Sequence, residues 1–217
     1  MMATSKTASK AADSTLLVLV VDRSGSMESI REDMEGGIKT LLSEQAVEEG
    51  ICLVTLVQFD DNYEVVAQGV PASELLTYRL VPRGSTALLD AIGRTISDVR
   101  ARVEALDPSG RPGHIVFAVI TDGMENASKE WSRLQVMDSV KARIDEGWNF
   151  SFLGANQDAI QEGGNLGMAA GSSLTYGASA EGAREAMSSV SASVRRMRRG
   201  ETQSIQYNED ERRRSAG

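Results

Sequence analysis

The sequence contains very little cysteine and histidine. Its 217 residues include one of each. A single cysteine cannot form an internal disulfide, which excludes a small secreted scaffold held together by disulfides. The same scarcity excludes a cysteine cluster that binds zinc and a histidine-rich metal site. A metal site built by this chain must therefore use oxygen ligands, and such ligands favour a hard cation.

Long apolar runs and an excess of basic charge are missing as well. The first apolar run, at 16–21, ends at Asp22 and is too short for a signal-peptide core or a membrane span. We therefore expect a cytoplasmic protein that does not contact a membrane. Acidic residues outnumber Lys and Arg by 31 to 23, and the sequence pI is near 4.8. This balance argues against a nucleic-acid partner, which is usually bound by a basic surface.

The sequence does contain an alternation of apolar runs and helical stripes. Near-continuous apolar runs are typical of strands buried on both faces, and they occur at 16–21, 51–59, 114–121 and 148–153. Residues 62–67 follow Asp60-Asp61 and are expected to return as an edge strand in a hairpin. Apolar side chains at helical spacing occur at 30–42, 88–103, 131–144 and 183–197, and a short helix at 158–166 precedes a short strand at 172–176. This order predicts an α/β fold with a doubly wound, mostly parallel sheet, one antiparallel edge strand and helices on both faces.

The chain divides into one domain and two polar ends. We expect residues 1–13 to form a flexible leader, 14–199 to form the domain, and 200–217 to form a polar, disordered tail. Cys52 lies in an apolar strand and is expected to be a core residue. The arginine cluster at 195–199 ends the last predicted helix, where basic side chains complement the helix C-terminus, and we expect it to stay in solvent.

Short oxygen-bearing side chains follow the predicted strands. In sheets of this kind, ligands bind beyond the carboxyl ends of the strands. Asp22, Ser24 and Ser26 follow the first strand, Asp122 follows the strand at 114–121, and Thr86 precedes the second long helix. Two carboxylates and three hydroxyls that converge in this way suit Mg²⁺, whose oxygen ligands lie at about 2.0–2.1 Å.

Three motifs resemble those of von Willebrand factor type A (VWA) domains. Asp22-Arg-Ser24-Gly-Ser26 resembles the family's DxSxS signature, which alone is a weak signal because five-residue patterns recur by chance. The segment that begins Gly84-Ser-Thr86-Ala-Leu-Leu is similar to the family's threonine segment, and Ile120-Thr-Asp122-Gly is similar to its final aspartate segment. All three occur in the family's order, at the expected places relative to strands and helices.

The resemblance implies a Rossmann-like VWA fold over residues 14–199 and a metal-ion-dependent adhesion site, whose residues would be Asp22, Ser24, Ser26, Thr86 and Asp122. In the family the serines bind the cation directly, and the threonine and aspartates bind it directly or through water. A carboxylate from a protein partner typically completes the shell. We therefore expect a monomeric, Mg²⁺-dependent protein-binding module, with Mn²⁺ or Ca²⁺ as other candidate ions. Intracellular bacterial relatives work beside ATPases or in stress responses, and Arg23 departs from the small residue common in animal members.

Other interpretations of these residues remain open. Helix capping could be the sole role of Asp22, Ser24, Ser26 and Thr86, and turn formation could be the sole role of Asp122. Glu125 and Asn126 are expected to cap the helix that follows them. Asn156, Gln157 and Asp158 are expected on the same face as the site, with Asp158 as a helix cap. None of these cap roles by itself requires a metal.

Two other functions compete with the binding module. A Mg²⁺-dependent phosphatase-like hydrolase also places an Asp after its first strand, but it needs a second Asp two residues later, where this chain has Ser24. A Ser-His-Asp hydrolase is disfavoured because His114, the only histidine, begins its strand and lies at the opposite edge of the sheet. A structural protein that has lost metal binding is disfavoured by the intact set of five residues.

Overall fold

The protein folds around one six-stranded sheet. A computed structural model describes residues 14–155 and 158–217, so the expected leader at 1–13 lies outside the described residues. The strands are β1 (Ser14–Asp22), β2 (Ile51–Phe59), β3 (Tyr63–Pro71), β4 (His114–Thr121), β5 (Asn149–Ala155) and β6 (Ser173–Tyr176). They lie in the order β3-β2-β1-β4-β5-β6, with β3 antiparallel to β2 and the other neighbours parallel. The predicted α/β sheet with one antiparallel edge strand is confirmed.

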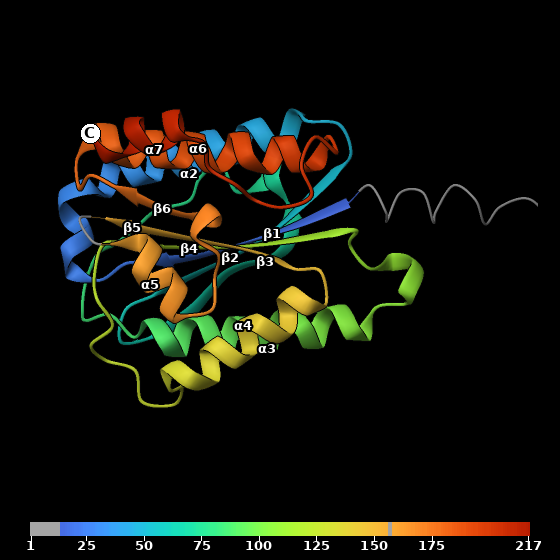
Figure 1. Cartoon of the computed structure of the whole chain (residues 1–217), viewed down its shortest axis with the longest axis horizontal. Coiled ribbons are helices and arrows are strands. Elements are labelled where there is room, and N and C mark those ends of the chain that lie inside the picture. The colour runs from blue at the N-terminus through green and yellow to red at the C-terminus, as the bar shows by residue number, and fades with distance from the viewer. Residues whose placement is uncertain (1–13, 156–157) are drawn as a thin grey trace, which may run out of the picture.

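Helices cover both faces of the sheet (Figure 1). One face carries α2 (Arg31–Val47) and α6 (Ala180–Arg198), with α7 (Glu209–Ala216) beside α6. The other face carries α3 (Leu88–Ala105), α4 (Arg133–Asp145) and α5 (Ala159–Asn165). Short 3₁₀ turns lie at η1 (Gly25–Ile30), η2 (Ala72–Glu74), η3 (Pro108–Gly110) and η4 (Ala170–Ser172).

The central strand β1 fixes the two cores. Leu17, Leu19 and Val21 belong to the core under α2 and α6, and Val18 and Val20 belong to the core under α3 and α4. All five side chains are fully buried. Burial of one such side chain stabilises the fold by about 1.5–3 kcal/mol, so the continuous apolar run of β1 anchors both layers. Its last residue, Asp22, is thereby held at the carboxyl edge of the sheet.

The C-terminal residues are part of the fold, and the prediction of a disordered tail at 200–217 is wrong. Ile205 and Tyr207 are buried in the core, although they are isolated apolar residues in a polar stretch. The Tyr207 hydroxyl lies 2.6 Å from the Ser151 hydroxyl. Helix α7 follows with a capping box, in which Asn208 and Glu211 satisfy each other's backbone N–H groups. Two anchor residues and a capped helix therefore order a segment that is polar in composition.

Backbone contacts join this segment to β6. The Arg212 guanidinium donates to the carbonyl of Ser173, the first residue of β6. The N–H of Gly177, just after β6, donates to the carbonyl of Ser215 at the end of α7. The C-terminal segment, residues 203–216, thus contacts both ends of the sheet's last strand while α7 lies beside α6.

The arginine cluster at the end of α6 binds the end of α2. Arg198 donates to the carbonyls of Gln45, Glu49 and Gly50, and Arg199 forms an ion pair with Glu48. Carbonyls at a helix C-terminus carry partial negative charge and lack helical partners, which explains their attraction for arginine. The expectation of a solvated cluster holds for Arg199, which is exposed, but Arg198 instead binds the carbonyls at the end of a neighbouring helix.

Two single residues lie where the sequence placed them. Cys52 is buried in the core, and His114 begins β4, where it pairs with Thr15 at the start of β1. His114 is therefore at the opposite edge of the sheet from Asp22. Within the described residues, no helix is both long and apolar enough to cross a membrane.

Candidate metal centre

The five predicted site residues come from three segments that meet at the carboxyl ends of the central strands. Asp22 is the last residue of β1, and Ser24 and Ser26 lie in the turn that leads into η1. Asp122 directly follows β4, the parallel neighbour of β1. Thr86 lies two residues before α3. Parallel pairing brings the carboxyl ends of β1 and β4 together, so the fold itself joins residues about a hundred positions apart.

Hydrogen bonds connect four of these residues, three of them through side chains alone. One oxygen of Asp22 accepts from the backbone N–H of Ser24 at 2.6 Å. The hydroxyls of Ser24 and Ser26 lie 3.1 Å apart, and the Ser26 hydroxyl donates to Asp122 at 2.7 Å. Asp22 and Ser24 are buried, whereas Ser26 is exposed. The group therefore has a buried base and an open side that faces solvent.

Gly123 shows that Thr86 belongs to the same group. A methyl group on Gly123 would lie 3.0 Å from the Thr86 hydroxyl oxygen and 3.7 Å from both Asp22 Oδ2 and Ser26 Oγ. Three of the predicted oxygens thus lie within 4 Å of the place that one β-carbon would take. A side chain at this position would crowd the Thr86 hydroxyl and would only touch the other two oxygens, which favours glycine after Asp122.

Burial makes the two carboxylates basic. Removal from water raises the pKa of Asp22 to about 6, against the opposing hydrogen bonds from Thr121 and Ser24. Burial also raises the pKa of Asp122, although the Ser26 hydroxyl bond acts the other way. A carboxylate that is costly to ionise gains most from a nearby cation, so this environment favours occupancy by a positive ion.

Thr121 is a supporting residue that sequence analysis missed. Its hydroxyl donates to Asp22 Oδ2 at 2.6 Å and accepts from the N–H of Gly123 at 3.1 Å. It therefore holds one oxygen of Asp22 and fixes the turn after β4. Its only sequence signal was its place directly before Asp122, which equally suits a buried strand residue.

The donor set fits a hard divalent cation. Within the described residues, no three His, Cys, Asp or Glu side chains cluster as metal ligands, so a site at this edge depends on hydroxyl oxygens. A hydroxyl can donate its proton to a carboxylate and still offer a lone pair to an ion. Ser26 already donates to Asp122, and its oxygen can bind a cation without losing that bond. Asp22, with a hydrogen bond on each oxygen, is set to act through its charge or a bridging water.

The loop after Asp122 supports the threonine segment. Asn126 accepts from the backbone N–H of Thr86 at 2.9 Å, and Glu125 accepts from the N–H of Leu89 in the first turn of α3. The prediction that these residues cap the next helix is wrong, because Ser132 caps α4. Their side chains turn back to the preceding helix, whose first N–H groups lack partners of their own.

The residues after β5 are described only in part. Asn156 and Gln157 lie outside the described residues. Asp158 accepts from the N–H of Gln161 and caps α5, as predicted. It is therefore assigned to the helix and not to the metal centre.

Arg23, between two of the site residues, points away from them. It is 3% exposed, and its guanidinium binds Asp60 at 3.0 Å and also pairs with Glu64. Asp60 also binds Arg83, and these hydrogen bonds and charges hold the pKa of its carboxyl below the usual range even though burial acts to raise it. The departure from a small residue at position 23 thus leaves the cation face clear.

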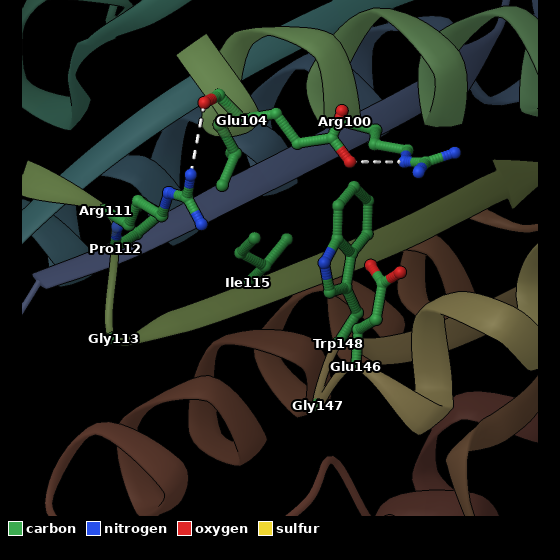
Figure 2. Close-up of a pocket in the computed structure, with 10 residues that line it drawn as sticks. Arg100, Glu104, Arg111, Pro112, Gly113, Ile115, Glu146, Gly147 and Trp148 are labelled. Atoms are coloured by element: carbon green, nitrogen blue, oxygen red, sulfur yellow. Dashed lines mark hydrogen bonds and ion pairs between the residues drawn. The ribbon is translucent and has the colours of Figure 1, made fainter. Parts of the chain in front are cut away.

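A separate pocket lies at the other edge of the sheet (Figure 2). Its volume is about 390 Å³, and its walls include Ile115 near the start of β4 and Trp148 just before β5. Arg100 and Glu104 on α3 form an ion pair at its rim. Since the candidate metal centre lies at the carboxyl ends of the strands, this pocket plays no part in it.

Comparisons with known proteins gave matches by structure alone. No protein-family model and no curated protein matched the sequence. Proximal thread matrix protein 1 from the mussel byssus was solved with a zinc-occupied metal-ion-dependent adhesion site (MIDAS) motif. It is similar over 83% of this chain and 46% of its own, with 16% identity and a TM-score of 0.62. The pilus adhesin SpaC from Lactobacillus rhamnosus GG, in its open conformation, is similar over 84% of this chain and 30% of its own, also with 16% identity and a TM-score of 0.62.

A third solved structure is a von Willebrand factor type A protein. The von Willebrand factor type A protein from Catenulispora acidiphila is similar over 83% of this chain and 42% of its own, with 16% identity and a TM-score of 0.54. The chain spans less than half the length of each of these three proteins. The sheet order, the helical layers and these similarities together show that this chain has the fold of a von Willebrand factor type A domain.

Proposed function

We propose that this protein is a divalent-metal-dependent binding module, with Asp22, Ser24, Ser26, Thr86 and Asp122 as its metal site. The observation that carries the proposal is the pair of serine hydroxyls, 3.1 Å apart, beside two carboxylates whose pKa values burial has raised. Neutral hydroxyls, the buried Asp22 and the half-buried Asp122 around one open side form an oxygen site for a hard cation.

Mg²⁺ is the ion that we propose, with Mn²⁺ and Ca²⁺ as the other candidates. Small hydroxyl oxygens and few carboxylates suit an octahedral ion that keeps some of its water. The mussel protein was solved with zinc in this motif, which supports a divalent cation on this fold without selecting one for this chain.

The ligand that we propose is an Asp or Glu side chain on a protein partner. Because both oxygens of Asp22 already accept hydrogen bonds, Asp122 would be the one carboxylate bound directly to the ion, and a shell of neutral hydroxyls with one carboxylate leaves the ion able to attract an incoming carboxylate. The exposed side of the site, at Ser26, gives a partner access. We further propose a monomer that acts within an ATPase-linked or stress-response complex, with no nucleic acid or membrane partner. A module of this kind needs no catalytic groups, so we do not propose an enzyme.

Calorimetric titration with Mg²⁺, Mn²⁺ and Ca²⁺ tests the metal site. The unmodified protein is expected to bind at least one of the three ions at one site. Ser26→Ala and Asp122→Ala should weaken that binding strongly. Asp158→Asn is the matched control, because it removes a carboxylate after a neighbouring strand but outside the site. Equal binding by all four proteins, or no binding by any, would remove the metal assignment.

A pull-down tests partner recognition. Capture of a protein in Mg²⁺ buffer should be lost in EDTA and in Ser26→Ala, and free glutamate should compete with it. Capture that survives both EDTA and the substitution would show binding at another surface.

A further inference from the structure

Asp60 lies where three segments around the metal centre meet. It follows β2 directly and is 1% exposed. One carboxylate oxygen accepts from Arg23 at 3.0 Å and from Arg83 at 2.7 Å. The other accepts from the backbone and side-chain N–H groups of Asn62 at 2.6 and 3.1 Å. Among the described residues, the hydrogen bonds of the Asp60 carboxylate therefore go to Arg23, Arg83 and Asn62, and none goes to a predicted metal-site residue.

Two of these neighbours belong to the loops that carry metal-site residues. Arg23 lies between Asp22 and Ser24, and Arg83 lies three residues before Thr86. The Asp60 carbonyl also accepts from the N–H of Ala87 at 3.1 Å. The same two loops are joined directly by the bond from the Arg83 N–H to the Arg23 carbonyl, at 2.7 Å. We call residues 23–26 the serine loop and residues 83–86 the threonine loop. Asp60 thus connects these two loops on the side away from the site oxygens.

The close packing of the threonine loop against Asp60 requires glycine at position 84. The φ angle of Gly84 is +69°. Its carbonyl accepts a hydrogen bond from the N–H of Gly25 at 3.2 Å. A methyl group on Gly84 would lie 3.3 Å from the Asp60 β-carbon and 2.6 Å from a carboxylate oxygen of Asp61. The threonine loop therefore passes close against Asp60 before it reaches Thr86.

We propose that Asp60 is a positioning residue of the metal centre, which sets the distance between the serine hydroxyls and Thr86 by binding Arg23 and Arg83 together. This inference rests on the proposed metal-binding function. Residues behind the ligands of a metal typically change its affinity by about 10–100-fold when they are replaced. Asp60→Asn keeps the shape of the side chain but removes the charge that holds two guanidinium groups, so a loss of affinity in this range is expected.

Loss of charge alone could weaken cation binding, and two variants separate charge from position. Glu64→Gln removes the negative charge of a second carboxylate that pairs with the Arg23 guanidinium, but it breaks no hydrogen bond to the threonine loop. It should weaken binding much less than Asp60→Asn does. Arg83→Gln removes a positive charge, so simple electrostatics predicts tighter cation binding. The positioning role predicts weaker binding, which is the opposite sign.

Stability must be separated from affinity as well. Val140→Ala shortens a buried side chain of α4, a helix that contributes no residue to these loops, and should lower the unfolding temperature without changing the metal dissociation constant. Each variant is first tested for folding by its thermal transition in EDTA. Titration calorimetry with Mg²⁺, or Mn²⁺ if that binds more tightly, is then run well below the transition.

The outcomes are distinct. Weaker binding in both Asp60→Asn and Arg83→Gln, with Val140→Ala unchanged, supports the positioning role. Unchanged or tighter binding in Arg83→Gln overturns it, and this variant decides alone if Asp60→Asn does not fold. An equal loss in Glu64→Gln or in Val140→Ala also overturns it. If the unmodified protein binds no divalent cation, the proposed function itself fails and the positioning role fails with it.

Discussion

The buried Asp22 should give the metal-free protein an unusual dependence on pH. Its pKa rises from 3.8 to about 6 on folding, mainly because burial removes its carboxylate from water. The folded state therefore holds a proton more tightly than the unfolded state does between about pH 4 and pH 6. It follows that ionised Asp22 costs stability, and that this cost appears as the pH rises through 6.

The size of the effect follows from the shift. Each pKa unit corresponds to about 1.4 kcal/mol, so a shift of about two units corresponds to roughly 3 kcal/mol. Below about pH 4 Asp22 is protonated in both states and costs nothing. Near pH 7 the full cost is present in the metal-free protein. Asp22→Asn cannot ionise, so its free energy of unfolding relative to the unmodified protein should rise by roughly 3 kcal/mol between pH 4 and pH 7.

Urea unfolding in EDTA measures this difference. Tryptophan fluorescence can follow it, because Trp131 and Trp148 both pack on the sheet core. Comparison of two proteins at each pH cancels the titration of all other carboxylates. Asp158→Asn serves as the matched control, since it makes the same substitution at an exposed helix cap outside the site. A difference between Asp22→Asn and the unmodified protein that is equal at pH 4 and pH 7 would refute the reasoning.

Three further predictions concern single contacts. Gly123→Ala places a methyl group 3.0 Å from the Thr86 hydroxyl and should weaken Mg²⁺ binding in calorimetry while the thermal transition changes little; unchanged affinity would exclude Thr86 from the site. Tyr207→Phe leaves the buried Ser151 hydroxyl without its partner and should lower the free energy of unfolding by about 1–3 kcal/mol in urea; no loss would mean that the C-terminal segment is not anchored there. Glu125→Ala removes a carboxylate that accepts a hydrogen bond from the N–H of Leu89 at the start of α3 and should lower the free energy of unfolding by about 1 kcal/mol, measured in the same way; a neutral result would show that water replaces the cap.

Much of the fold was readable because its signals are local and strong. The strands β1, β2 and β4 are near-continuous apolar runs, and the predicted ranges at 51–59 and 114–121 equal the observed ones. Buried parallel strands leave this pattern because both of their faces pack against helices. The predicted site residues were placed at one edge by the same logic, since the carboxyl ends of neighbouring parallel strands lie together.

The missed features depend on contacts between distant, polar residues. Composition marked 200–217 as a tail, but two buried side chains, Ile205 and Tyr207, were enough to fix it to the core. Asp60 looked like a turn residue beside Asp61, and nothing local showed that Arg23 and Arg83 would meet on it. Such contacts are decided by tertiary packing, which hydrophobic periodicity does not encode.

The C-terminal segment also determines where another strand could add to the sheet. It binds backbone groups at Ser173 and Gly177 on either end of β6, which leaves β3 as the edge without a covering segment among the described residues. Val65 and Val66 are exposed on β3, while two irregularities in its pairing with β2 interrupt the flat ladder that aggregation needs. Removal of residues 203–217 would free the backbone groups of Ser173 and Gly177, so this polar segment also gives the β6 side of the sheet protection against the addition of another strand.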